Sequence, residues 1–482
     1  MVLASLGVVL ALVVLIVLAY RGHSVIVAAP VAALIGVLFS GAPLMASYTQ
    51  IFMPAAGNFI VSFFPLFLVG AIFGTLMSSS GYADDLAQWI SRLVGAKKAI
   101  LATAIATALL TYGGISAWVI AFTIVPVANS LFREAGIPRR LMPAAIALGI
   151  FTFATAALPG SPQIHNAIPT RYFGTTTYAA PVLGIIGAVV TFALGMAWLE
   201  YRTRTLVAAG EVYEPPAPQA GTTPAGTDAA PSAATRTDTP TSRWPDRTTT
   251  LRGLRGLLPI LIVVGMNLLF VYVLSTRMDF SYLAEDKFGA TDISAVMGTW
   301  SVVIAMATAI IVIFLMNPGM FSTYVRSLSE GAKNAVLPAF TTASEVGFGA
   351  VIASLAVFAA LQNSIFDVSD NPVVIGAVAT AVISGLTGSS SGGLTITLET
   401  FGDQLTQLAN DQGISLELLH RVIAMASVSF DSLPHNGAIV TLLLVCGLTH
   451  RQSYKDVGMV TIVPPLIGVL VVMGLGAVFP AL

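Results

Sequence analysis

Two stretches of the sequence combine histidine, asparagine and helix-breaking residues in a pattern that suits the binding of a small anion. The first, LPGSPQIHNAIPT, covers residues 158–170, and the second, SFDSLPHNGA, covers residues 429–438. Prolines interrupt a helix, and imidazole, amide and hydroxyl groups beside the interruption can hydrogen-bond a carboxylate or a hydroxyl. The candidate binding groups are Ser161, Gln163, His165, Asn166, His435 and Asn436.

Two acids in apolar surroundings are candidates for carrying a coupled cation. Asp431 lies three residues before Pro434, and Glu345 lies in the segment TTASEVGFGA. An acid at membrane depth is costly and commonly marks a proton or ion pathway. The alternative for Asp431 is a structural role, as an acceptor for His435 or for backbone N–H groups freed by the break. Asp84 and Asp85 are expected to be solvated loop charges.

The composition requires that membrane helices position these groups. The chain has 482 residues, of which 56% are hydrophobic and 9% are charged, and its net charge is -1. About 20 apolar residues span a hydrocarbon core, and runs of that length recur along the whole chain. The balanced charge gives no basis for a nucleic-acid partner, no pattern indicates a metal or a cofactor, and the single cysteine, Cys446, excludes an internal disulfide.

The hydropathy pattern predicts an all-α polytopic membrane protein with ten crossings. Two further glycine-rich segments, 98–132 and 372–408, are predicted to be re-entrant hairpins, with two ordinary helices joined by a surface loop as the alternative. We expect the first span to be retained rather than removed as a signal peptide, so that the mature chain begins near Met1. The predicted crossings are 2–20, 24–41, 58–77, 141–170 (broken), 178–200, 257–275, 293–316, 337–362, 417–449 (broken) and 457–480.

A segment rich in proline, alanine and threonine separates two membrane halves. Residues 205–250 cannot bury a core and are predicted to be a disordered linker between repeats at 1–204 and 251–482. Lysines and arginines concentrate in cytoplasmic loops, which places the linker in the cytoplasm and both termini outside a bacterial-type inner membrane. Four basic residues then lie at or near the outer face, namely Arg171, Arg277, Lys287 and Arg421.

The two halves repeat the same order of landmarks. The tip TYGG at Thr111 is followed 25 residues later by Gly136-Ile137, and the tip TGSS at Thr387 is followed 26 residues later by Gly413-Ile414. Each half then reaches a Leu-Pro break and a His-Asn pair, directly in the second half and after five extra residues in the first. Five crossings per half give the halves opposite orientations, which is typical of inverted-repeat transporters whose broken helices meet at the midplane.

Both breaks and both hairpin tips are suited to an anion site by their backbone chemistry. Backbone groups freed by a break cannot face lipid, so the break must line a cavity enclosed by protein. The N-termini of the half-helices direct N–H groups and a positive dipole end at that cavity. Glycine and serine at the tips allow close approach and add donors without bulk.

At LPGSPQIHNAIPT followed by RYFGTTTYAAP, with SFDSLPHNGA in the second half, the chain resembles the gluconate permease family of proton symporters, within the ion transporter superfamily. The resemblance implies proton-coupled uptake of a sugar acid such as gluconate by an elevator-like movement, and the different wording of the first break leaves a smaller acid such as 3-hydroxybutyrate as a competitor. By the same resemblance, substrate contacts are expected at Gly113, Gly114, Ser116, Ser161, Asn166, Ser389, Ser390, Ser391 and Asn436.

Three other functions remain to be weighed. A sodium-coupled carboxylate carrier is possible, because the tips can supply oxygen ligands to sodium. An intramembrane enzyme could use His165, His435 and Asp431 as metal ligands, although no metalloprotease spacing or nucleophile elbow supports it. A channel lacks a charged ring or filter sequence. The leading hypothesis is a non-enzymatic, homodimeric symporter of a small hydroxymonocarboxylate.

Overall fold

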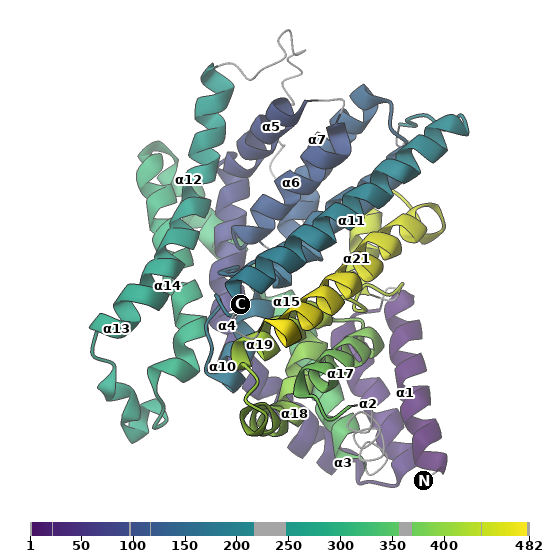
Figure 1. The fold of residues 1–482 in the computed structure, drawn as a ribbon, viewed down its shortest axis with the longest axis vertical. Coiled ribbons are helices and arrows are strands. Elements are labelled where there is room, and N and C mark those ends of the chain that lie inside the picture. The colour runs from purple at the N-terminus through teal and green to yellow at the C-terminus, as the bar shows by residue number, and fades with distance from the viewer. Residues whose placement is uncertain are drawn as a thin grey trace.

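The computed structural model describes residues 2–21, 23–95, 98–115, 117–215, 247–355, 369–434 and 436–479. These residues form helices joined by short loops, and the described part of the chain contains no strand. The predicted all-α class is therefore confirmed. The N-terminus lies at one end of the long axis, and the segments that flank residues 216–246 lie toward the other end (Figure 1).

The first half contains the helices that carry the first hairpin and the first break. The bounds of its longer helices agree with the predicted spans to within a few residues at most ends, although α11 continues well past residue 200. The elements are α1 (Val2–Tyr20), α2 (Val25–Ser40), α3 (Leu44–Ser47), α4 (Met53–Ser79), α5 (Tyr82–Val94), α6 (Ala99–Tyr112), α7 (Ala117–Ala135), α8 (Met142–Ile150), α9 (Phe153–Ala156), α10 (Ile164–Phe173) and α11 (Pro181–Ala208).

The second half has the same order of helices around its own hairpin and break. Its long helix α15 starts at Phe321 rather than at residue 337, because its first part, FSTYVRSLSEGAKNAV, is polar and charged and hydropathy does not detect it. The elements are α12 (Arg247–Leu269), α13 (Ser275–Arg277), α14 (Ile293–Met316), α15 (Phe321–Ser354), α17 (Pro372–Thr387), α18 (Ser390–Asp411), α19 (Leu416–Ser427), α20 (Gly437–Val445) and α21 (His450–Val478).

Six helical segments of the described chain are long and apolar enough to cross a membrane by themselves, and four shorter apolar helices accompany them. The protein is thus a multi-pass membrane protein. The six segments are Leu44–Ser79, Pro181–Ala208, Arg247–Arg277, Ile293–Met316, Pro318–Ser354 and His450–Val478.

Both predicted breaks are present. After α9 the chain is non-helical until α10 begins at Ile164, and after α19 it is non-helical until α20 begins at Gly437. In each break a proline cannot supply the backbone N–H that would continue the helix. Gly160 adds a left-handed turn at φ 73° in the first break, a backbone conformation that other residues rarely adopt.

The tips of both hairpins are buried inside the protein. Thr111 is 2% exposed at the first tip, and Thr387 is 8% exposed at the second. Gly393 near the second tip has no room for a side chain, since an added Cβ would lie 2.3 Å from Ser384 Oγ of the facing arm. Neither tip is a surface loop, so the hairpin interpretation is favoured over its alternative.

Contacts between the halves follow a reciprocal pattern. Helix α4 packs along α15, α2 packs on α15 as α14 packs on α4, and α10 packs on α18 as α20 packs on α7. In Figure 1 the first hairpin, α6 and α7, lies in the upper part of the molecule, and the second, α17 and α18, lies in the lower part. This arrangement supports an inverted repeat, which remains a prediction.

Two expectations from the sequence need correction. Asp84 and Asp85 lie in the first turn of α5, an amphipathic helix that buries Leu86 and Ile90, rather than in a loop. The ends of the predicted linker are helical, because α11 extends to Ala208 and α12 begins at Arg247. The centre of the predicted linker lies outside the described residues.

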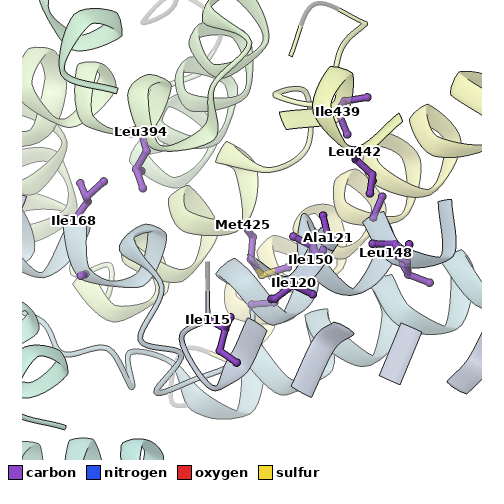
Figure 2. Close-up of a cluster of buried hydrophobic side chains, with 14 of the residues drawn as sticks. Ile115, Ile120, Ala121, Leu148, Ile150, Ile168, Leu394, Met425, Ile439 and Leu442 are labelled. Carbon is purple, nitrogen blue, oxygen red and sulfur yellow. The ribbon is translucent and has the colours of Figure 1, made fainter. Parts of the chain in front are cut away.

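Apolar side chains from both halves meet around the hairpins and breaks. Ile115 at the first tip, Ile168 of α10, Leu394 of α18 and Met425 of α19 are each at most 2% exposed. Figure 2 shows Ile168 and Leu394 next to each other, where α10 packs on α18. This close packing holds the start of α10 against the start of α18.

Candidate functional site

The tip of the second hairpin gathers polar side chains from both halves of the chain. His165 Nε2, at the start of α10, lies 2.7 Å from Ser390 Oγ at the start of α18. The carboxylate of Asp431 in the second break lies close to the same Ser390 hydroxyl. The structure therefore brings together three of the residues that the sequence singled out, although they are separated by up to 266 positions.

Two half-helix N-termini converge at this contact. Helix α10 begins at Ile164 and α18 begins at Ser390, so His165 and Ser390 both lie in first turns. Ser389 caps α18 by accepting the Gly392 N–H at 3.1 Å. Each N-terminus carries about half a positive charge from the aligned peptide dipoles, which favours an anion between them.

Asp431 is buried, at 3% exposed, and is solvated by hydroxyl groups. Ser432 Oγ donates to Asp431 Oδ1 at 3.0 Å, and the Ser390 hydroxyl lies close by. No ion pair joins Asp431 to any residue that the structure describes. A buried carboxylate without a cationic partner has a high penalty for ionisation, which suits a group that takes up and releases a proton.

Glu345 reaches the same hairpin tip from α15. It is 6% exposed, and its carboxylate lies close to the Ser389 hydroxyl. Gly392 leaves room for it, since a Cβ added there would lie 3.0 Å from Glu345 Oε2. The second tip thus contacts both acids through adjacent serines, while Ser391 follows as a half-buried residue in the first turn of α18.

The polar groups of the first break bond mainly to the protein itself. Ser161 Oγ donates to Ala154 O at 2.9 Å, and Gln163 Nε2 donates to Thr111 O of the first tip at 2.7 Å. The Asn166 amide donates to Thr177 O at 2.7 Å. These bonds give Ser161, Gln163 and Asn166 a structural role, and their predicted substrate contacts stay untested.

Arg421 is a residue whose burial the sequence analysis did not anticipate. It was expected at or near the outer face, which stays a prediction, and its side chain on α19 is 0% exposed beside the first break. Its Nη1 donates to Asn166 Oδ1 and to Ala156 O, both at 2.8 Å. Its Nε and Nη2 donate to Ala179 O at 3.0 Å and 2.7 Å, and Nη2 also reaches Thr177 O at 3.3 Å.

These contacts occupy all five N–H donors of the guanidinium, so none remains for a substrate. Arg421 therefore joins the second half to the backbone of the first break. A local signal did exist, because in LELLHRVIAMAS it lies inside an apolar helix. The positive-charge rule outweighed that signal, since it treats each arginine as a loop residue.

The neighbouring His420 reinforces the same junction. Its Nδ1 lies 2.7 Å from Thr175 Oγ1, and its Nε2 lies 3.4 Å from Asn166 Oδ1. From a third side, Asn267 of α12 donates to Gly160 O at 3.1 Å. The first break is thus held by polar side chains from two helices of the other half.

The remaining predicted residues divide into three cases. Gly113 and Gly114 pack against protein, since an added Cβ would lie 2.7 Å from Ile260 and 2.2 Å from Met306. Asn436 caps α20, accepting the Ala438 N–H at 2.7 Å and donating to Asp431 O at 3.0 Å. Ser116 and His435 lie outside the described residues.

No cluster of three or more histidine, cysteine or acidic side chains that could hold a metal ion occurs among the residues that the structure describes. The arrangement instead offers hydroxyls, one imidazole, two acids and helix N-termini around one hairpin tip.

Comparison with known proteins identifies the class of protein. The chain is 42% identical over 466 residues to a Bacillus subtilis protein described as the uncharacterized transporter YxjC, covering 94% of this chain and 95% of the relative. The chain belongs to the YxjC transporter family. It is therefore a membrane transporter, and not an enzyme. No family model matches the sequence.

A solved structure shows a related fold. The YdaH transporter of Alcanivorax borkumensis, whose crystal structure revealed an unusual topology, superposes with a TM-score of 0.50 at 17% identity and covers 88% of each chain. At this identity the likeness concerns the fold alone. The resemblance to gluconate permeases, the substrate and the coupling ion are separate questions.

Proposed function

We propose that the protein is a proton-coupled symporter of a small hydroxymonocarboxylate, related to the gluconate permeases. The observation that carries this proposal is the 2.7 Å contact between His165 and Ser390 at two facing half-helix N-termini, with the buried Asp431 close to the same serine. The N-termini provide a positive potential for a carboxylate. The acid beside them provides a place for the coupled proton.

Proton coupling follows from the charges at the second tip. A substrate anion placed beside an ionised Asp431 or Glu345 would be repelled, and no described cation neutralises either acid. Protonation of an acid removes this repulsion. By linkage, a proton that strengthens anion binding is itself bound more strongly when the anion is present, and this reciprocity drives symport.

The chemistry around the site favours a small hydroxy acid. Serine hydroxyls at the second tip can bond hydroxyl groups without bringing further charge. Both a sugar acid such as gluconate and a shorter acid such as 3-hydroxybutyrate carry one carboxylate and at least one hydroxyl. The guanidinium of Arg421 is not available to the substrate, because all of its donors are bonded within the protein.

The transport cycle is an elevator-like movement of the hairpins and breaks against the other helices. The reciprocal packing of the halves supports this proposal, because two alternative packings of similar repeats give two states of similar energy. In the proposed setting, the protein is a homodimer in a bacterial-type inner membrane, with both termini outside and the linker in the cytoplasm.

Uptake into proteoliposomes tests the proposal. Labelled gluconate and 3-hydroxybutyrate are offered to the purified full-length protein with an inward proton gradient, in the absence of sodium. Accumulation that requires the gradient and disappears with a protonophore supports proton symport. Accumulation that follows a sodium gradient and ignores pH would identify the sodium-coupled carrier instead, for which the oxygens of Glu345 and Ser389 are the available ligands.

A further inference from the structure

An apolar crevice opens between the first hairpin and the helix that follows the first break. It has a volume of about 320 Å³ and lies between α6 and α11, which run next to each other in Figure 1. Ala108 and Leu109 line it from α6, Ala188 and Val189 line it from α11, and Leu158 of the first break completes the lining. The crevice therefore separates an arm of the hairpin from a neighbouring helix.

The walls of the crevice are held in place by close packing against other helices. A Cβ added to Gly149 of α8 would lie 2.7 Å from Ala104 O, so the backbone of α8 already touches that of α6. A Cβ added to Gly187 of α11 would lie 2.9 Å from Val472 of α21. Neither wall can move toward the other without losing such contacts, and packed interiors resist this kind of rearrangement. The crevice is thus a stable feature of the helix packing.

The lining offers almost nothing to a polar ligand. Tyr112 carries the one polar side-chain group among the described lining residues, and its hydroxyl donates to Pro159 O at 2.9 Å. A buried water needs roughly two to four polar partners, and an engineered apolar cavity of about 150 Å³ stays dry and takes up benzene instead. Water and a hydroxy acid are therefore disfavoured here, and an apolar ligand is favoured.

The mouth of the crevice opens toward the lipid. Ile185 and Val189 are exposed within Pro181–Ala208, a segment long and apolar enough to cross a membrane, so they face hydrocarbon. The walls extend over 105–112 and 185–192, which is about two turns of each helix. A helix of a second copy, about 10–12 Å wide, would exceed the volume of the crevice within one turn. A single acyl chain is slim enough to enter.

We propose that this crevice binds one acyl chain of a bilayer phospholipid, and that the chain takes the place of protein packing beside the first hairpin. Tyr112 links the ligand to the hairpin tip, because its ring lines the crevice while its hydroxyl ties the end of α6 to the first break. A chain packed against that ring holds Tyr112 in position and thereby restrains the tip. The site is separate from the polar groups at the second tip.

Photo-crosslinking tests whether a chain enters the crevice. The full-length protein is held in nanodiscs of phosphatidylcholine that carries a diazirine in one acyl chain, and adducts are mapped by mass spectrometry. Ala108 and Ala188 are 8% and 3% exposed, so an adduct on either requires a chain inside the crevice. Ala188→Phe fills the space with a ring and should abolish the adduct on Ala108. Ala193→Phe, at an exposed position of α11, is the matched control and should leave that adduct unchanged.

Thermal unfolding and amide hydrogen exchange test what the chain does. In a bile-salt-type detergent, which has no acyl chain, the lipid-stripped protein should unfold at a lower temperature and exchange faster at residues 105–112. Added phosphatidylcholine should reverse both changes, because a ligand of the native state stabilises it. Ala108→Phe fills the crevice from the opposite wall, should Ala188→Phe not fold. In a filled variant both measurements should be independent of phosphatidylcholine, whereas Ala193→Phe should respond as the native protein does.

The outcomes separate the two parts of the proposal. Adducts that disappear when the opposite wall is filled and persist in Ala193→Phe support the site. The absence of adducts at both alanines, or adducts that persist in the filled variants, overturns it. A cross-link between residues 105–112 of two copies, in place of lipid adducts, would assign the crevice to a dimer contact and also overturn it. Adducts without any effect of phosphatidylcholine on hydrogen exchange overturn the support of the hairpin alone.

Discussion

The two helix breaks have the same sequence landmarks, but their asparagine side chains have different hydrogen-bond partners. In each, an asparagine amide donates to the carbonyl five residues earlier, from Asn166 to Ser161 and from Asn436 to Asp431. The Asn166 oxygen then accepts from Arg421 and is 0% exposed, while the Asn436 oxygen caps its own helix.

This difference has a source in the repeat. Arg421 lies eight residues after Gly413, and the matching position eight residues after Gly136 is Ala144. Arg421 of the second half thus holds the first break in place by hydrogen bonds. Among the described residues, no cation of the first half does the same for the second break. The first break is a rigid junction from which His165 projects, and the second keeps an unneutralised acid. The first break therefore provides fixed geometry, and in the proposed function the second break binds the coupled proton.

Removal of the Arg421 guanidinium should lower the stability of the protein more than any other change considered. Arg421→Ala leaves buried acceptors at Ala156, Ala179 and Asn166 without donors, and we expect a loss of about 3 kcal/mol or more in the free energy of unfolding. Thermal and denaturant unfolding of the purified protein measures it. Arg204→Ala is the matched control, because Arg204 is 83% exposed and pairs only with Glu200 at 3.8 Å; its expected effect is within about 0.5 kcal/mol. Equal effects of the two changes would show that Arg421 does not pin the break.

Neutralising the acid of the second break should leave the fold intact and abolish coupling. In Asp431→Asn the amide oxygen can still accept from Ser432, which donates to Asp431 at 3.0 Å in the native protein, so the unfolding midpoint stays close to the native value. Concentrative uptake in a proton gradient is lost, while exchange of labelled for unlabelled substrate continues. Asp403→Asn, at an exposed position of α18, is the control. Normal concentrative uptake by Asp431→Asn would remove this acid from the coupling step.

The two asparagines provide a paired comparison. Asn436→Ala removes a helix cap and should lower stability by about 1 kcal/mol. Asn166→Ala additionally leaves a donor of Arg421 without an acceptor at a buried position, and should lower stability by about 2–3 kcal/mol. Denaturant unfolding of both variants side by side measures the difference. A larger loss for Asn436→Ala would reverse the assignment of the rigid and the titrating break.

The smallest expected loss of stability is that of a substitution in the five extra residues of the first break, GSPQI. Ser161→Ala removes one hydrogen bond, from Ser161 Oγ to Ala154 O, and should lower stability by about 1 kcal/mol. Because that hydroxyl is already bonded, the preference between gluconate and 3-hydroxybutyrate should not change. Competition between the two acids in the uptake assay tests this. A changed preference would make the insert part of the substrate site.

Local sequence was sufficient for most of the helices and for both breaks. Apolar runs such as Ile293–Met316 match the observed helix at both ends, and the breaks at Pro159 and Pro434 lie where proline removes the backbone donor. These features depend on hydropathy and backbone chemistry within a few residues. The amphipathic helix α5 was missed because its hydropathy is low, although its acids occupy a helical first turn.

Only the tertiary structure decided which polar groups meet. That His165 meets Ser390, and that Arg421 lies inside the protein with all of its donors bonded, depends on contacts between segments more than 200 residues apart. A sequence pattern states which hydrogen bonds a side chain can make. Which of them are made depends on the packing of helices from both halves, because hydrogen bonds act over about 3 Å.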